Sequence, residues 1–302
     1  MRRQSSCHTD RLWQNDAVET DAIMSLALSR AVELPAALLA GAAPIHRAGL
    51  LDVRLAVTEA EIAAAQALRY EIFYDEMGAR PDPITARARR DIDPYDMLCD
   101  HLLVIDHADS ARPRVVGTYR LLRQDVAMAN GGFYSAGEFD LSALIAQSGP
   151  GRQLLELGRS CVAPAWRTTA TISLLWRGIA TYLARHGIGH LFGCASLHGA
   201  DARAHLAELS WLYHNHLAPP ELRATALPPH RVEMNRLDAA AIDGRAASRA
   251  LPPLVKGYLR VGAMVGDGGF VDHQFNTVDV FVVMPVDRIT SRYAERFGAA
   301  ND

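Results

Sequence analysis

The chain has 302 residues, of which 49% are hydrophobic and 22% are charged. This composition is typical of a soluble globular protein and excludes a largely disordered chain, a collagen and a disulfide scaffold. With 31 basic and 34 acidic side chains the formal net charge is −3, so no nucleic-acid partner is expected. The four cysteines are widely spaced and contain no CxxC pair, which indicates a reducing, cytoplasmic location.

Residues 1–50 differ from the rest of the chain: they are polar at first, then rich in alanine and leucine and interrupted by prolines. We predict a poorly ordered extension here, with room for one amphipathic helix over 22–39. Such a helix can lie on a membrane surface, but Arg30 is its only basic residue, so a loosely docked segment is favoured. The longest uncharged apolar run has 12 residues, 34–45, too few to span a bilayer. Residues 51–302 are predicted to form one domain.

Hydrophobic periodicity predicts the regular elements of this domain. Strands are expected over 53–57, 101–106, 114–122, 154–162, 190–195 and 278–284, and helices over 58–74, 141–147, 169–186, 201–215 and 252–261. Thr58 and Glu61 form a capping box at the start of the first helix, and Gly187 ends the helix over 169–186. Residues 78–97 and 218–250 lack periodicity and are predicted as a long loop and an irregular excursion. This order of elements favours an α+β fold with a mixed sheet.

The most informative segment is 154–170, which begins as an apolar strand that carries Glu156 and Arg159. Their odd spacing places them on opposite faces of a regular strand, unless a bulge near Gly158 turns one of them. A Val-x-Pro sequence then ends the strand, and a helix begins near Thr168. The free backbone N–H groups at such a helix start form a ready site for an anion.

A strand, Val162-x-Pro164, an arginine turn and a long helix resemble the acyl-donor motif of the GNAT acyltransferase superfamily. The resemblance implies a GNAT-like fold, with a mixed, mostly antiparallel sheet flanked by helices. The turn is rich in glycine in typical acyl-CoA users, but here it is Arg-Thr-Thr-Ala-Thr over 167–171, which suits a donor that brings only a phosphopantetheine arm. The residues that match the donor-binding segment are Val162, Arg167, Thr168, Thr169 and Ala170. Arg167 would contact the pantetheine phosphate or the carrier protein, or else be an exposed arginine in a turn.

Further motifs resemble, in type and order, the signature of acyl-homoserine-lactone synthases. They are Arg69-x-x-x-Phe73, Asp91-x-Asp93-x-x-Asp96, Gly117-Thr-Tyr-Arg120 and Glu156-x-x-Arg159. A closer resemblance is to the ornithine N-α-acyltransferases, often labelled hemolysin-like. It is carried by Glu156-Leu-Gly-Arg-Ser-Cys-Val162, Leu174-Leu-Trp-Arg-Gly-Ile179, Phe192-Gly-Cys-Ala-Ser196, Leu251-Pro-Pro-Leu-Val-Lys-Gly-Tyr-Leu-Arg260 and Asp272-His-Gln-Phe-Asn-Thr277. This resemblance covers residues 53–290 but not the extension.

The family resemblance implies an enzyme that moves a 3-hydroxyacyl chain from acyl carrier protein to the α-amine of L-ornithine, giving lyso-ornithine lipid. No tightly bound cofactor is implied beyond the phosphopantetheine arm of the donor. Because the product is amphiphilic, peripheral contact with the inner membrane is a reasonable addition to the cytoplasmic location. The alternatives are an acyl-homoserine-lactone-type synthase or another GNAT acyltransferase and, outside the enzyme class, a membrane- or lipid-binding protein.

Glu156 and Arg159 are the candidate catalytic residues. An amine that attacks a thioester must be neutral, must lie in line with the carbonyl and needs the developing oxyanion stabilised. We predict that Glu156 is the base, directly or through water, because a carboxylate in an apolar strand is expected to have a perturbed pKa. The alternative is a structural ion pair of Glu156 with Arg159 or Arg120.

Ornithine carries one carboxylate and two ammonium groups, so its pocket should contain both guanidinium groups and carboxylates. The candidate substrate-binding residues are Arg69, Phe73, Asp93, Asp96 and Arg120, with Asp91 as a further carboxylate. Simpler interpretations are solvated or capping aspartates, Arg69 as an anchor for the loop, and Phe73 as part of the core.

Other reactive side chains are given structural roles. The histidines show no zinc spacing, so no metal site is predicted, and His273 is worth testing because it lies in a family motif. Cys161 and Cys194 follow or lie in apolar strands and are expected to pack in the core. The glycine-rich sequence 266–269 is predicted to be a turn before the last strand.

Overall fold

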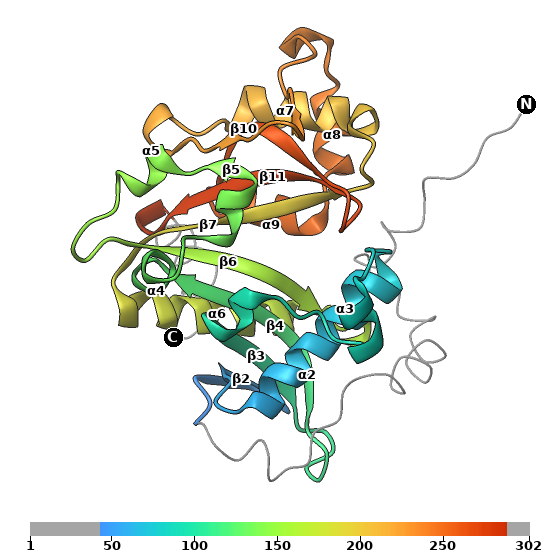
Figure 1. Cartoon of the computed structure of the whole chain (residues 1–302), viewed down its shortest axis with the longest axis vertical. Coiled ribbons are helices and arrows are strands. Elements are labelled where there is room, and N and C mark those ends of the chain that lie inside the picture. Colours follow the sequence, from blue (N-terminus) through green and yellow to red (C-terminus); the bar gives the residue numbers. More distant parts are fainter. Residues whose placement is uncertain (1–42, 289–302) are drawn as a thin grey trace, which may run out of the picture.

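A computed structural model describes residues 43–288, and this range contains eleven strands and eight α-helices (Figure 1). The strands are β1 (His46–Ala48), β2 (Leu51–Leu55), β3 (Asp100–Asp106), β4 (Arg114–Arg123), β5 (Phe139–Asp140), β6 (Gln153–Val162), β7 (Ile188–His198), β8 (Thr225–Ala226), β9 (Arg231–Val232), β10 (Met264–Asp272) and β11 (Thr277–Pro285). The helices are α2 (Glu59–Tyr70), α3 (Pro83–Ala88), α4 (Gln124–Ala129), α5 (Ser142–Ile145), α6 (Thr169–His186), α7 (Leu206–His216), α8 (Gly244–Ala250) and α9 (Pro253–Arg260).

All of these strands belong to one sheet, in the order β1-β2-β3-β4-β6-β7-β11-β10-β8-β5, with β9 paired to β10. Neighbouring strands run antiparallel except for β6–β7 and β10–β8. The parallel pair β6–β7 is connected by α6. The predicted α+β fold with a mixed, mostly antiparallel sheet is therefore confirmed.

Helices cover both faces of the first half of the sheet (Figure 1). Successive residues of a strand point to opposite faces, and β2 shows both sides. Val53 packs so closely on α6 that a Cβ at Gly178 would lie 2.9 Å from its methyl group. Arg54, the next residue, forms a buried ion pair with Glu61 of α2. The helices α2 and α6 therefore lie on opposite faces.

The helix α2 begins at the predicted capping box: Thr58 accepts a hydrogen bond from the N–H of Glu61, whose carboxylate accepts one from the N–H of Thr58. The α-helix ends at Tyr70 and continues as a π-helical segment, η3 (Glu71–Glu76), so the predicted end at residue 74 falls inside that segment. Such π-helical segments are frequent at functional sites.

The predicted loop over 78–97 contains two short helices, α3 and the 3-10 helix η4 (Pro94–Met97). Each is begun by an aspartate that caps a proline-started turn: Asp82 precedes α3 and Asp93 precedes η4. Elements of four to six residues show no hydrophobic periodicity, which is why the pattern did not predict them. The excursion over 218–250 likewise contains β8, β9 and α8.

The glycine-rich sequence 266–269 is part of β10, so the predicted turn is wrong. The glycines are needed because the strand is irregular and crowded. A Cβ at Gly266 would lie 2.6 Å from the carbonyl oxygen of Ala224, and Gly268 has a φ of +85°. The register of β10 against β11 shifts between Val265 and Gly269.

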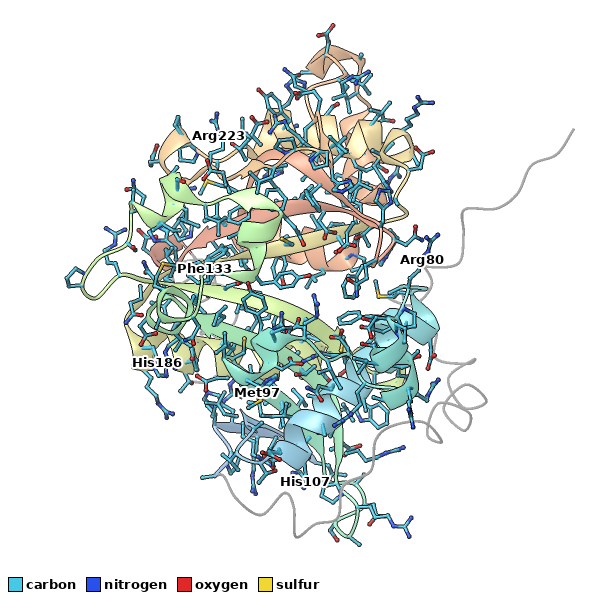
Figure 2. The ribbon with its side chains drawn as sticks, in the orientation of Figure 1. Arg80, Met97, His107, Phe133, His186 and Arg223 are labelled. Carbon is cyan, nitrogen blue, oxygen red and sulfur yellow. The ribbon has the colours of Figure 1, made fainter. Side chains whose placement is uncertain are left out.

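Each face of the sheet carries an apolar core. On β11, Val280 and Val282 belong to the larger, main core under α6 and α7. Phe281 belongs to a second core on the other face. Phe133, in the segment between α4 and β5, packs in this second core, while Met97 is 83% exposed at the surface (Figure 2). The buried apolar residues of α2, Ala64, Ala65 and Leu68, belong to the main core.

The described residues begin inside the predicted extension. Residues 43–50 include β1, which pairs with β2, whereas residues 1–42 and the helix predicted over 22–39 lie outside the described range. Across 43–288, none of the helices has the length and apolar character needed to cross a membrane.

Candidate active site

A bulge interrupts β6 where it carries Arg159. Between the pairs Thr118–Cys161 and Arg120–Gly158, one residue of β4 opposes two residues of β6. Arg159 is the first of those two, and its φ of +50° lies in the left-handed region. The bulge near Gly158, which the sequence left as a possibility, is therefore present. It turns the Arg159 side chain to the other face of the strand.

The bulge brings the two candidate catalytic residues to one face, where both contact Tyr134. The N–H of Tyr134 donates a hydrogen bond of 2.9 Å to Oε2 of Glu156. The guanidinium carbon of Arg159 lies 4.8 Å from the centre of the Tyr134 ring. Glu156 is also the last residue of β6 that pairs with β7, opposite Phe192, so the two strands separate beyond this point.

The carboxylate of Glu156 is buried and held by the start of the 3-10 helix η5 (Tyr134–Gly137). Its Oε1 accepts hydrogen bonds from the N–H (2.7 Å) and the hydroxyl of Ser135. Burial raises the pKa of Glu156 above its ordinary value although these donors oppose the shift. Within residues 43–288 Glu156 forms no ion pair with Arg120 or Arg159, so the structural ion pair considered as an alternative is not formed.

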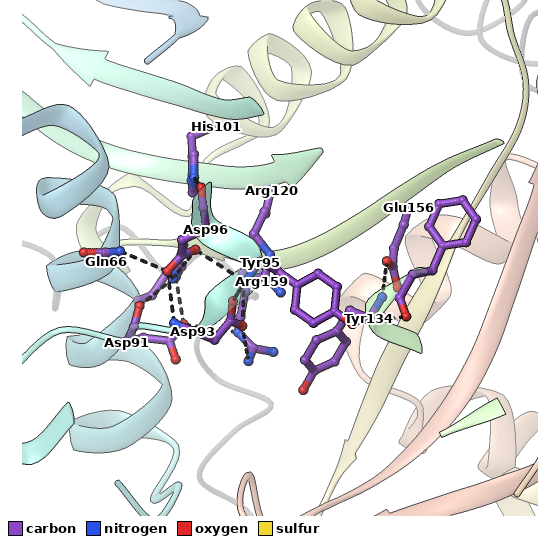
Figure 3. Close-up of polar contacts among 12 residues, drawn as sticks. Gln66, Asp91, Asp93, Tyr95, Asp96, His101, Arg120, Tyr134, Glu156 and Arg159 are labelled. Carbon is purple, nitrogen blue, oxygen red and sulfur yellow. Dashed lines mark hydrogen bonds and ion pairs between the residues drawn. The ribbon is translucent and has the colours of Figure 1, made fainter. Parts of the chain in front are cut away.

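Beside Glu156 lies a buried network of three arginines and three aspartates, which we call the Arg–Asp network (Figure 3). Its members are Arg69, Arg120, Arg159, Asp91, Asp93 and Asp96. Three positive and three negative charges cancel within the network. All four of the predicted charged substrate-binding residues belong to it.

Arg69 is fully buried and ties the segment 91–97 to α2. Its guanidinium lies 2.8 Å from a carboxylate oxygen of Asp91 and 2.9 Å from one of Asp96. Gln66 donates a hydrogen bond to Asp96, and the Tyr74 hydroxyl donates one to Asp91. The interpretation of Arg69 as a loop anchor is confirmed by these contacts.

Arg120 and Arg159 hold the same segment from the sheet. Arg120 lies 2.6 Å from Asp93 and 3.3 Å from Asp96, and Arg159 lies 3.1 Å from both Asp91 and Asp93. Burial raises the pKa of Asp96, but the Arg69 guanidinium and the other donors outweigh it and lower this pKa to about 2. All three aspartates are thus paired with arginines rather than solvated, and the pKa values of Asp91 and Asp96 are lowered.

Phe73 reaches the site through a second aromatic ring. Its ring packs edge-on against Phe275 at 5.9 Å, and the guanidinium of Arg159 lies 4.6 Å from the Phe275 ring. Phe73 is half-buried and also packs on the main core. Phe73 therefore packs on the aromatic ring that contacts Arg159.

A second group of carboxylates lies on the same face, and we call it the acidic trio: Glu138, Asp272 and Asp279. Carboxylate oxygens of the three residues all lie within 4.8 Å of one another, and this is the group of side chains in residues 43–288 that could also hold a metal ion. Burial raises the pKa of Glu138, and the negative charge of Asp279 raises it further. Burial also raises the pKa of Asp279.

The acidic trio is linked to Glu156 by two side chains. Sγ of Cys194 lies 3.1 Å from Oε2 of Glu138 and 3.4 Å from the hydroxyl of Ser135, which in turn donates to Glu156. None of these linking residues or trio members was among the predicted site residues. Two sequence signals could have found members of the trio. Asp279, like Glu156, is a carboxylate in an apolar strand, and Asp272 is the first residue of the motif 272–277.

The predicted donor-binding residues lie at the far end of β6 and the start of α6. Val162 is buried, and Thr168 caps α6 by accepting a hydrogen bond of 3.3 Å from the N–H of Thr171. Thr169 and Ala170 are exposed. Arg167 is not an exposed turn residue, because its guanidinium makes two 2.7 Å hydrogen bonds to Glu76 at the end of η3.

Burial makes the thiols of Cys161 and Cys194 poor nucleophiles. Cys161 is buried in the main core, and burial raises the pKa of its thiol to about 12. The prediction of core packing is confirmed for Cys161. Cys194 packs against the second core, as predicted, and also contacts Ser135 and Glu138; burial raises the pKa of its thiol well above the usual value.

Residues 68–177 match the family described as acetyltransferase (GNAT) domain. The chain is 49% identical over 254 residues to an L-ornithine N(alpha)-acyltransferase of Agrobacterium fabrum, an alignment that covers 83% of this chain and 86% of that protein. It is 46% identical over 274 residues to an enzyme of the same name from Rhizobium meliloti, with 90% of each covered. Among solved structures, the CoA-dependent acyl-homoserine lactone synthase MesI is 14% identical, with a TM-score of 0.42 over 83% of this chain and 97% of that chain.

Proposed function

The chain belongs to the family of L-ornithine N(alpha)-acyltransferases, and from this premise we propose that it moves a 3-hydroxyacyl chain from acyl carrier protein to the α-amine of L-ornithine. The product is lyso-ornithine lipid, made in the first step of ornithine lipid biosynthesis. Four relatives with this name, 44–49% identical over most of the chain, support the reaction and the acceptor. The observation that carries the proposal is the placement of a buried carboxylate, Glu156, beside Arg159 where β6 and β7 separate.

The reaction exchanges a thioester for an amide. The α-amine nitrogen attacks the thioester carbonyl, a C–N bond forms, and the C–S bond breaks so that the thiol of the phosphopantetheine arm leaves. The amine gives up one proton, and the departing thiolate takes one. A base positioned near the amine and a cation near the carbonyl oxygen would lower the barrier to these steps.

In this proposal Glu156 receives the proton, directly or through one water. Its raised pKa brings the carboxyl closer to the range in which a general base works. Oε2 accepts one hydrogen bond, from Tyr134, and a carboxylate oxygen has capacity for a second. Arg159, at 13% side-chain exposure, is paired with Asp91 and Asp93, and in this proposal it also donates an N–H on the same face to the carbonyl oxygen.

The proposed donor is a phosphopantetheine arm on acyl carrier protein, with no tightly bound cofactor. The turn before α6 contains no glycine, and Arg167 is engaged by Glu76, so neither resembles a cradle for a pyrophosphate. The exposed start of α6 at Thr169 and Ala170 presents backbone N–H groups to one phosphate. We place the reaction in the cytoplasm, with peripheral contact at the inner membrane, because the product is amphiphilic.

Mass spectrometry of the purified protein tests the proposal. The protein is incubated with 3-hydroxyacyl carrier protein or the matching acyl-CoA, and with a panel of amino acids. We expect an ornithine amide from the carrier-protein donor only. Product from acyl-CoA alone would contradict the proposed donor, and no amide with any acceptor would favour a lipid-binding protein.

A further inference from the structure

Building on the proposed function, we propose that the acidic trio binds the side-chain ammonium group of the acceptor amino acid. It would thereby select an acceptor with a second amine and direct the acyl group to the α-amine. Glu138, Asp272 and Asp279 come from the end of η5, from β10 and from β11, so the site is built by the tertiary fold.

The spacing of the trio suits a primary ammonium. Such a group has three N–H donors, and each makes hydrogen bonds of about 2.7–3.2 Å to oxygen. Three oxygens around one nitrogen at about 2.8 Å lie at most about 4.8 Å apart when the nitrogen is central in their plane. The carboxylate oxygens of the trio lie within 4.8 Å of one another.

A buried carboxylate oxygen of the trio has no hydrogen-bond partner within residues 43–288. Asp279 is 5% exposed, and its Oδ1 makes no hydrogen bond within the described range. Thr277 is 2% exposed and lies on the same face of β11, and the hydroxyl groups of Thr277 and Ser196 are near enough to Asp279 to lower its pKa against the effect of burial. Buried polar atoms are nearly always satisfied, so the unpartnered carboxylate oxygen of Asp279 indicates room for a further donor at the trio.

The charge of the trio is also unbalanced. None of its members forms an ion pair in the part of the chain that the structure describes, and the guanidinium of Arg159 is already bound by Asp91 and Asp93. Carboxylates this close repel one another, and a bound cation would relieve that repulsion. The acceptor of the proposed reaction carries such a cation at the end of its side chain.

This assignment explains which amine reacts. An ammonium group surrounded by carboxylates keeps its proton, because nearby negative charge favours the charged form. A protonated amine cannot attack a thioester. The amine held by the trio is therefore the unreactive one, and the α-amine is left to react near Glu156, to which the trio is linked through Cys194 and Ser135.

The test compares L-ornithine with L-norvaline, which has the same carbon skeleton without the side-chain amine. The variants are Asp279→Asn and Glu138→Gln, and the matched control is Asp238→Asn, which removes an exposed carboxylate. We expect KM for ornithine to rise about 10- to 100-fold in both trio variants, since each loses a charge-assisted contact. The preference for ornithine over norvaline in kcat/KM should fall by the same factor, while KM for the donor and the control variant stay as in the wild type.

The wild-type protein provides a test that does not depend on folding of the variants. Equal kcat/KM for ornithine and norvaline in the wild type would overturn the inference and leave acyl transfer to ornithine intact. No ornithine amide at all would contradict the proposed function instead. A fall in kcat with unchanged KM in Glu138→Gln, or activity that EDTA removes and Mg²⁺ restores, would also overturn the inference, in favour of a base or a metal site respectively.

Discussion

Two groups of buried carboxylates lie on one face of the sheet, and they differ in how their charge is balanced. In the Arg–Asp network each aspartate faces at least one guanidinium, and the pKa of Asp96 is lowered. In the acidic trio no carboxylate is paired with a cation from residues 43–288, and burial raises the pKa of Glu138. Balanced charges hold a loop against the sheet, whereas unbalanced charges are costly unless a ligand completes them.

The comparison adds a structural role for the residues of the family motifs, whose predicted role in substrate binding stays a prediction. Arg69, Arg120 and the aspartates of 91–97 match a signature, but their polar atoms are largely used within the protein. Asp91 and Asp93 also hold Arg159, whose guanidinium bridges the two carboxylates and faces the Tyr134 ring. The trio, which we propose as the site for the side-chain ammonium of the acceptor, contains none of the predicted substrate-binding residues.

The largest expected effect concerns Glu156, the carboxylate between the two regions. Glu156→Gln should lower kcat about 10²- to 10⁴-fold, the usual contribution of a general base. Single-turnover kinetics with the carrier-protein donor measures this effect. Ser135→Ala is the matched control, since it removes one donor to Glu156 but leaves the carboxylate and both backbone contacts, and we expect less than about 10-fold loss. A Glu156→Gln enzyme that keeps kcat within about 10-fold of the wild type would remove Glu156 from the base role.

The next effect tests whether the Arg–Asp network is a scaffold. Arg69→Met removes the main partner of buried Asp96 and one of the two arginine partners of buried Asp91, and should lower the free energy of unfolding by about 3–5 kcal/mol. Urea denaturation measures it. Arg89→Met removes an exposed ion pair with Asp75 and should cost about 1 kcal/mol or less. Equal losses in the two variants would show that the network does not stabilise the fold.

Local signals in the sequence predicted the elements with strong end markers. The helix over 169–186 has a threonine cap at its start and Gly187, with a φ of +60°, at its end, and both bounds are confirmed. β10 was missed because its glycines resemble a turn. They are required by the approach of the Ala224 carbonyl, a tertiary contact that no local pattern contains.

The candidate site was likewise predictable only where a local sequence signal marks a residue. Glu156 was found because a single carboxylate in an apolar strand is conspicuous, and its face relative to Arg159 depended on a bulge that spacing alone left open. Asp279 has the same local pattern but gains meaning only beside Glu138, which lies 141 positions earlier in the chain. Long-range juxtaposition of this kind cannot be read from periodicity.

The smallest expected effect gives the two regions opposite dependence on pH. An acid whose pKa is lowered by folding stabilises the protein above its ordinary pKa of 3.8, and this contribution is lost as the pH falls toward about 2, as for Asp96. An acid whose pKa is raised contributes fully below its ordinary value and loses that contribution as the pH rises. Asp279 loses its stabilising contribution as the pH rises from about 4 through about 6. Glu138 loses its contribution as the pH rises from about 4 through about 8.

Urea denaturation of the ligand-free protein at a series of pH values separates these contributions. Between pH 4.5 and 8.5 the trio should lower the free energy of unfolding by on the order of a few kcal/mol, since each unit of raised pKa costs about 1.4 kcal/mol once the carboxyl ionises. Glu138→Gln should flatten this decline and Asp238→Asn should not. Saturating ornithine should also flatten it, because a cation bound only by the folded trio stabilises the ionised form. A decline that is the same in Glu138→Gln and the wild type would show that the trio is not the unbalanced region, and the contrast with the Arg–Asp network would then fail.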